Sequence, residues 1–244
     1  MLKIDFMKEL DFMKNLILTD EKLPPEAKDS LAKHGDIIEF STSNITYDAI
    51  SGHPDIFFCK TNNKLIVAPN LPESYLMLLK EKNFPFVIGS RNVESKYPSS
   101  ARYNAVVTDN FLIHNLKITD STILENTKEL NQIHINQAYT RCNLLPLKNN
   151  SFITSDKGIY KTLNEEKLNI IYVSPDEILL EGFSNGFFGG ACGVSKNKVF
   201  IIGSLKYLSD GNKVRDFLKN LNYEIIELYD GPLVDGGSLM FLDF

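Results

Sequence analysis

The sequence lacks long apolar runs and clusters of basic residues. No segment approaches the ~18 consecutive apolar residues that a membrane-spanning helix needs. Lysines are spread along the chain without a basic run, and the net charge is −5, which argues against a nucleic acid held by electrostatic attraction. We therefore expect neither nucleic acid nor a membrane as a partner.

Cysteine is also scarce. The three cysteines, Cys59, Cys142 and Cys192, are far apart and odd in number, which suits free thiols in a reducing cytoplasm better than a disulfide framework. Residues 1–20 carry charges throughout and lack the apolar centre of a signal peptide, so we expect a cytoplasmic protein. Because CxxC and HxxxH spacings are missing, the sequence predicts no metal site, and it suggests no cofactor.

What the sequence does contain is a repeated hairpin pattern. Residues 56–67, "IFFCKTNNKLIV", place two short apolar runs around an Asn-rich turn, which is typical of a β-hairpin. Similar stretches occur at 104–115, 143–156 and 191–204. Their turn centres, near positions 62, 109, 149 and 197, are 47, 40 and 48 residues apart. Such spacing indicates a repeated supersecondary unit with loops of different lengths.

Each hairpin is followed by a helical pattern and then a strand pattern. In residues 70–83, Tyr75, Leu78 and Leu79 follow the i, i+3, i+4 spacing of an amphipathic helix. "FPFVIGS" at 84–90 then predicts a strand. The expected unit is therefore ββαβ, in the order strand, turn, strand, helix and strand.

The two ends of the chain read as the two parts of a fifth unit. Residues 236–244 predict a strand without a partner, and residues 15–41 predict strand, helix and strand without a first strand. If "SLMFL" pairs with "NLILT", the last strand completes the first unit and closes a ring. The alternative is that short α/β elements recur by chance. We favour the repeat, and with it a single domain over 1–244.

Five ββαβ modules around a pseudo-fivefold axis resemble the pentein, or guanidine-modifying-enzyme (GME), superfamily. The matching motifs are "GHPD", "RYN", "RCN", "FFGGACG" and "VDGGS", which precede or open the first strands of the modules. The resemblance implies an α/β propeller of pentein type with a small molecule in a central pocket. The loops that lead into the first strands would form its mouth, namely 42–55, 90–103, 136–142, 175–190 and 229–237.

The resemblance also implies a chemistry. Catalytic members use a cysteine to attack a guanidinium carbon, a histidine as acid and base, and acidic residues to hold the guanidinium. In several of them the cysteine follows glycines in the last module, often as Gly-Gly-Gly-x-His-Cys. In this chain Met240 and Phe241 stand where that histidine and cysteine would fall. The usual C-terminal nucleophile is therefore missing.

Three other residues are the candidates for catalysis. His53 and Asp55 lie in "GHPD", where Pro54 restricts His53 to extended conformations. Cys142 lies in "RCN", beside Arg141, which would lower the thiol pKa if both side chains faced the pocket. The structural alternatives are a turn stabilised by Asp55 and a buried, packing Cys142.

A second group of residues is expected to bind the substrate. The chain has four arginines against 22 lysines, and Arg91, Arg102 and Arg141 all lie in the leading loops, where an arginine fork would suit an anionic group. Loop-anchoring bonds to carbonyls are the alternative. Gly189 and Gly190 are expected to allow close backbone passage. The predicted substrate-binding residues are Arg102, Asn104, Arg141, Gly189, Gly190, Asp235 and Ser238.

Three functions follow from these observations. The first is a hydrolase-like or transferase-like enzyme for a small guanidino or amidino compound. The second is a small-molecule binding protein without catalysis. The third is a protein-interaction module, because the superfamily also includes a ribosome anti-association factor. Sequence alone leaves the choice between them and the oligomeric state open.

Overall fold

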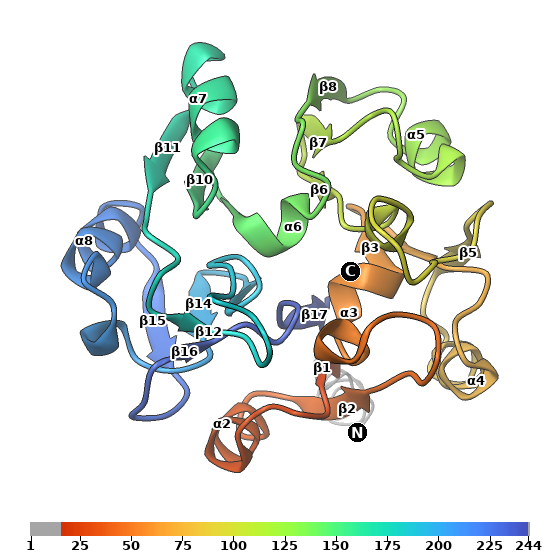
Figure 1. Ribbon diagram of the computed structural model, residues 1–244, viewed down its shortest axis with the longest axis horizontal. Coiled ribbons are helices and arrows are strands. Elements are labelled where there is room, and N and C mark those ends of the chain that lie inside the picture. The colour runs from red at the N-terminus through yellow and green to blue at the C-terminus, as the bar shows by residue number, and fades with distance from the viewer. Residues whose placement is uncertain (1–15, 244) are drawn as a thin grey trace, which may run out of the picture.

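Small three-stranded sheets recur along the chain in the computed structural model, which describes residues 16–243. In each sheet the central strand pairs antiparallel with the strand before the turn and parallel with the strand after the helix. Figure 1 shows the sheets around a common centre, with the longer helices at the outside and the short α3 and α6 near the middle. The fold is a mixed α/β architecture, as expected.

Four units follow one another along the chain. The first contains β3 (Phe58–Lys60), β4 (Leu65–Val67), α4 (Glu73–Glu81) and β5 (Phe86–Ile88). The second contains β6 (Val106–Val107), β7 (Phe111–His114), α5 (Ser121–Asn126) and β8 (Asn131–His134). The third contains β9 (Leu144–Leu147), β10 (Ser151–Thr154), α7 (Lys157–Glu165) and β11 (Asn169–Tyr172). The fourth contains β13 (Cys192–Ser195), β14 (Lys198–Ile201), α8 (Gly211–Asn220) and β15 (Glu224–Glu227).

The fifth unit joins the two ends of the described chain. It contains β17 (Met240–Leu242), β1 (Leu16–Asp20), α2 (Pro25–Leu31) and β2 (Asp36–Phe40). β17 pairs antiparallel with β1, with Ile17 opposite Phe241, as the sequence predicted. The five sheets are nevertheless separate, because strand hydrogen bonding within residues 16–243 does not continue from one sheet to the next. The pairing of the two ends is confirmed, the described sheets do not join into one closed sheet, and the closure of a five-module ring stays a prediction.

Shorter elements lie in the leading loops. They are the 3₁₀ turns Asp48–Ile50 and Ser99–Ala101, the one-turn helices α3 (Pro54–Phe57) and α6 (Thr140–Asn143), and a two-stranded sheet of β12 (Ile178–Leu179) and β16 (Leu233–Val234). A further 3₁₀ turn, Leu205–Tyr207, lies between β14 and α8. Periodicity could not reveal elements of two to four residues. In the described part of the chain no helix is both long and apolar enough to cross a membrane. The stretch 1–15, on which the signal-peptide argument depended, lies outside the described residues.

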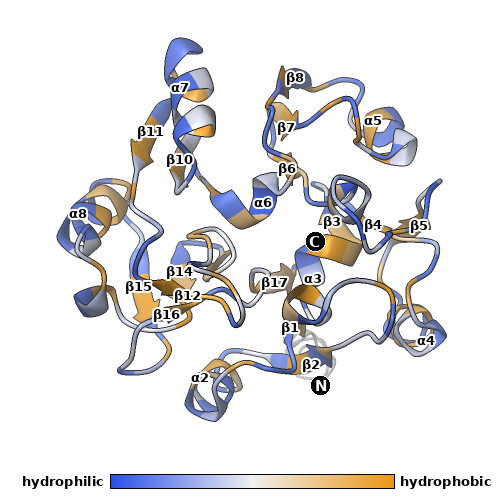
Figure 2. Cartoon of the chain, viewed as in Figure 1, coloured by the Kyte–Doolittle hydropathy of each residue, from blue (hydrophilic) through white to orange (hydrophobic). Residues whose placement is uncertain are grey.

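The burial of the strands shows which parts of the sheets form the core. The central strands β4, β10 and β1 are buried along their whole length, whereas β8, a last strand, buries only Ile133. Figure 2 shows hydrophobic residues along β14 to β16 and hydrophilic residues on much of α7. Side-chain caps begin two of the helices, since Asp120 accepts from Thr122 N and Asp156 from Ile159 N. The apolar strand residues thus fix the centre on which the leading loops converge.

Replacing Phe241 with alanine should test the pairing of the two ends. Phe241 is 2% exposed in β17, and its ring centroid lies 4.6 Å from that of Phe200. We expect Phe241→Ala to lower the free energy of unfolding by about 3–5 kcal/mol, since it leaves a cavity. Urea denaturation measures the loss. Met77→Ala, at a half-exposed position of α4, is the control and should change stability by less than about 0.5 kcal/mol.

A buried histidine should make stability depend on pH. His114 is fully buried between Thr119 Oγ1 (2.8 Å) and the Ala138 carbonyl (2.9 Å), and burial lowers its pKa to about 4. Because the unfolded chain takes up this proton near pH 6.5 and the folded chain does not, folding stability falls as pH drops from about 6.5 to 4. His114→Gln should remove on the order of 3 kcal/mol of this fall. Urea denaturation at several pH values measures the free energy of unfolding of both proteins. The same dependence of this free energy on pH in both proteins would contradict the prediction.

Candidate functional site

Two one-turn helices bring the predicted catalytic residues to the centre. His53 has extended backbone angles (φ −73°, ψ 112°), as predicted from Pro54, and α3 begins directly after it. Asp55 follows in α3, and its amide donates to the Gly237 carbonyl at 3.2 Å. Cys142 lies in α6 rather than at the start of a strand. The leading loops of three units therefore meet at this point.

The carboxylate of Asp55 connects these loops. Its Oδ2 accepts a hydrogen bond from the Cys142 thiol at 3.1 Å and one from the Ser238 hydroxyl at 2.7 Å. Asn104 completes the arrangement, because its amide donates to the Asp55 carbonyl at 3.0 Å and to Cys142 Sγ at 3.2 Å. Asn104 Oδ1 in turn accepts from Cys142 N at 3.1 Å. These four residues are all buried.

His53 stands next to this cluster, between two further carboxylates. Its Nε2 is 3.7 Å from Asp20 Oδ2, and its Nδ1 is 4.0 Å from Asp235 Oδ1. Burial lowers the pKa of His53 to about 4, although the charge of Asp55 acts in the opposite direction. The ligand-forming atoms of His53, Asp55 and Cys142 all lie within 4.8 Å of one another. The structure thus brings together the three residues proposed for catalysis, while their roles stay predictions.

The site brings several buried acidic groups together. Burial and the nearby Asp55 raise the pKa of Asp235 to about 7, although the amides of Gly237 and Phe187 donate to its carboxylate. Burial also raises the pKa of Asp20 to about 6. Raised pKa values mean that burial favours the protonated, uncharged forms of these carboxyl groups, although Lys22 acts against this at Asp20. A cation bound beside Asp20 and Asp235 would favour their charged forms.

The thiol of Cys142 is held in its protonated form. Burial, followed by the charges of Asp55 and Asp235, raises its pKa well above the ordinary value. The Arg141 guanidinium donates to the carbonyls of Gly189 (2.9 Å) and Cys192 (3.4 Å), and its charge interacts with that of Cys142. The net shift of the thiol pKa is nevertheless upward, so the expected lowering by Arg141 does not prevail. All three cysteines are buried free thiols.

Two adjoining cavities lie beside His53. The smaller, of about 130 Å³, is lined by His53, Cys142 and Asp235 together with aromatic residues. The larger, of about 390 Å³, shares His53, Asp235 and Phe183 and also exposes Asp20. The aromatic walls are Tyr47, Tyr139, Phe183 and Phe187. Sequence analysis missed these aromatic residues and Asp20, because a single aromatic or acidic residue in a loop carries no motif.

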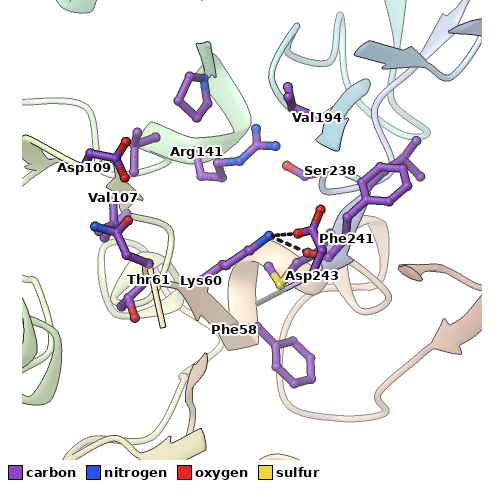
Figure 3. Close-up of a pocket in the computed structure, with 16 residues that line it drawn as sticks. Phe58, Lys60, Thr61, Val107, Asp109, Arg141, Val194, Ser238, Phe241 and Asp243 are labelled. Atoms are coloured by element: carbon purple, nitrogen blue, oxygen red, sulfur yellow. Dashed lines mark hydrogen bonds and ion pairs between the residues drawn. The ribbon is translucent and has the colours of Figure 1, made fainter. Parts of the chain in front are cut away.

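A third cavity lies on the side of the first strands (Figure 3). It measures about 320 Å³, and Arg141 and Ser238 contribute to its wall. Lys60 crosses its floor, where it forms an ion pair with Asp243 and donates to the Phe241 carbonyl at 2.6 Å. Two of the predicted substrate-binding residues, Arg141 and Ser238, therefore line this cavity.

Three further residues predicted to bind the substrate, Arg102, Gly189 and Gly190, make contacts that organise the loops themselves. Arg102 pairs with Glu94 at 3.0 Å and with Ser99 at 2.7 Å, so it is tied to its own loop. A Cβ on Gly189 would collide with the carbonyl of Arg141, and one on Gly190 with the carboxylate of Asp235. The close passage expected of these glycines is confirmed. Any direct contact of these residues with a substrate stays a prediction.

Asn104 should be essential to the order of the site. Asn104→Ala leaves the Cys142 amide and the Asp55 carbonyl without this partner in a buried place. We expect the free energy of unfolding to fall by about 2–4 kcal/mol, measured by urea denaturation. The matched control is Asn110→Ala, since Asn110 bonds Asn150 at the surface and its loss should have little effect. Equal losses in both variants would contradict this role.

Comparison with known proteins places the chain in a family. The family described as "Family of unknown function (DUF6873)" matches residues 18–240. No curated protein matches the chain.

Solved structures show the same fold. An amidinotransferase from Microseira wollei, of the saxitoxin biosynthetic pathway, matches with TM-score 0.55 and 10% identity, over 91% of this chain and 88% of that one. A mutant of C. jejuni agmatine deiminase with substrate bound matches with TM-score 0.52 and 12% identity, over 86% and 76%. A mutant of DDAH from Pseudomonas aeruginosa, complexed with citrulline, matches with TM-score 0.50 and 11% identity, over 88% and 92%. These proteins belong to the pentein/GME superfamily, so the resemblance seen in the sequence is confirmed at the level of the fold.

Proposed function

The chain belongs to the DUF6873 family of unknown function, and we propose that it acts on a small guanidino or amidino compound as a hydrolase-like or transferase-like enzyme. The proposed scaffold is a single five-module propeller of pentein type over 1–244. The pairing of β17 with β1 and the five similar sheets support this architecture. The guanidino-modifying enzymes among the structural neighbours support the substrate class.

One observation carries the proposal. The Cys142 thiol donates to the Asp55 carboxylate at 3.1 Å beside a cavity that His53 and Asp235 also line. A planar guanidinium offers paired donors that match carboxylates, so Asp55, Asp235 and Asp20 suit its charge and shape. Such a cation would also lower the pKa of the thiol, because a nearby positive charge favours the thiolate.

The proposed reaction has two halves. Asp55 takes the proton of Cys142, Sγ forms a bond to the amidinium carbon, and the proton passes through His53 to the leaving amine as its C–N bond breaks. Water, or an acceptor amine in a transferase, then loses a proton to His53 and attacks the same carbon. The C–S bond breaks, and the proton on His53 passes through Asp55 to the leaving thiolate, which restores the thiol.

A non-catalytic binding protein is the second candidate. The Cys142 thiol is held protonated, and the resemblance in sequence implies that the buried residues Met240 and Phe241 stand where the usual C-terminal histidine and cysteine would fall. A binding protein would keep the carboxylates and aromatic walls of the cavities without using the thiol. A protein-interaction module would have a filled centre and an exposed apolar patch on one face of the ring. The cavities therefore favour the enzyme and the binding protein over the interaction module.

Paired alkylating reagents would test the proposal. Chloroacetamidine is a cation with nearly the same shape as neutral chloroacetamide, so a site for amidinium should direct it to Cys142. We expect Cys142 to react at least about tenfold faster with the amidine, corresponding to about 1.4 kcal/mol of preferential stabilisation. Mass spectrometry of the digested protein assigns each modified cysteine.

Asp55→Asn is the decisive variant, because it keeps the shape of residue 55 but removes its charge. It should abolish the preference for the amidine, whereas Asp109→Asn, on the wall of the third cavity, should preserve it. If Cys142 of the wild-type protein reacts equally fast with both reagents, the proposed amidinium site is wrong. Preference without turnover of any guanidino or amidino compound would favour the binding protein.

A further inference from the structure

Two buried polar atoms in the site have no hydrogen-bond partner among residues 16–243. They are Nδ1 of His53 and Oδ1 of Asp55. His53 is 1% exposed and Asp55 is fully buried, so bulk water does not satisfy these atoms. An unpaired buried polar group costs about 1–3 kcal/mol, and in native proteins such groups commonly mark a position that binds an ion or an ordered water.

The unpaired atoms stand next to a third ligand-forming atom, the sulfur of Cys142. The ligand-forming atoms of His53, Asp55 and Cys142 lie within 4.8 Å of one another, and all three residues are buried. Together they offer one nitrogen, one carboxylate oxygen and one sulfur. A thiolate with an imidazole and a carboxylate suits zinc, whereas magnesium and calcium prefer oxygen ligands alone.

We propose that His53, Asp55 and Cys142 bind one zinc ion. Zinc lies about 2.0–2.3 Å from such ligands, so three ligand atoms that all lie within 4.8 Å of one another can reach one ion with small side-chain movements. The thiolate and the Asp55 carboxylate together balance the charge of a divalent ion. Sequence analysis did not reveal this site, because positions 53, 55 and 142 match no metal-binding spacing.

The surroundings resemble the outer shell of a metal site. Metal-bound histidines commonly turn the second ring nitrogen to a carboxylate, and His53 Nε2 faces Asp20 Oδ2 at 3.7 Å. The Ser238 hydroxyl holds the other oxygen of Asp55, and the Asn104 amide holds the sulfur. These contacts leave His53 Nδ1 and Asp55 Oδ1 available to the ion.

A fourth position and a route for the ion are also present. Asp235 Oδ1 is 4.0 Å from His53 Nδ1, close enough to act as a fourth ligand or to hold a metal-bound water. The cavity of about 130 Å³ reaches His53, Cys142 and Asp235. Three protein ligands with one open position are typical of zinc sites that contact small molecules.

This inference goes beyond the proposed function and does not rest on it. A zinc ion and an amidinium group both require Asp55 and the Cys142 sulfur, so the two cations exclude one another. Zinc would therefore protect Cys142 from chloroacetamidine. If the protein binds zinc but Cys142 shows no preference for chloroacetamidine, the zinc site stands and the amidinium site fails. If Cys142 shows the preference but the protein binds no zinc, the amidinium site stands and the zinc site fails.

Cobalt titration of the full-length chain, stripped with a chelator, tests the site. We expect one Co²⁺ per chain, a thiolate-to-cobalt charge-transfer band, the visible bands of a four-coordinate ion, and their loss on addition of Zn²⁺. Cys142→Ser should remove the charge-transfer band, and His53→Gln and Asp55→Asn should each weaken binding at least about 100-fold. Cys192→Ala and His114→Gln should bind like the wild type.

Two results would overturn the zinc site. One is the lack of a charge-transfer band in wild-type protein whose circular dichroism shows it to be folded. The other is a band that survives in Cys142→Ser or disappears in Cys192→Ala. If the ligand variants do not fold, alkylation of the wild type decides the question, because a zinc ion at this site must slow the labelling of Cys142 and leave the other cysteines unchanged.

Discussion

The centre of the molecule depends on one buried carboxylate. Asp55 is fully buried, and its Oδ2 accepts from the thiol of Cys142 and the hydroxyl of Ser238, which are 87 and 183 positions away in the sequence. A carboxylate out of water is costly unless it is hydrogen-bonded, so these donors have to be in place. The same requirement fixes α3, α6 and the turn at Gly237 relative to one another.

A second constraint follows from the first, because the carboxylates are crowded. Asp55, Asp235 and Asp20 surround a neutral His53, while the buried Arg141 donates its hydrogen bonds to backbone carbonyls. Burial, and after it repulsion among the acidic groups, raises the pKa of the Asp235 carboxyl and of the Cys142 thiol, although the charge of Arg141 acts against it. A cation relieves this repulsion. Either of the two proposed cations, amidinium or zinc, would therefore offset the negative charge of these groups. In the first proposal Cys142 acts as a nucleophile, and in the second it acts as a metal ligand.

The sequence predicted the sheets because apolar runs and turn residues specify them locally. It also predicted the pairing of β17 with β1, since two unpaired strand patterns at the ends implied each other. It missed α3 and α6, because a single helical turn has no periodicity. His53, Asp55 and Cys142 were found from their position before the first strands. Asp20 was missed, because only the folded chain brings the end of β1 to His53.

The last strand carries packing residues in place of reactive ones. Phe241 packs against Phe200, and Met240 belongs to the core around β3, so both residues stabilise the union of the chain ends. A polar histidine and a thiolate at these places would weaken that packing. The Cys142 sulfur reaches Asp55 from α6, in a different unit, and it does so without disturbing β17. Because the fold lets leading loops from several units converge, a nucleophile or a metal ligand can come from a new loop while the scaffold stays the same.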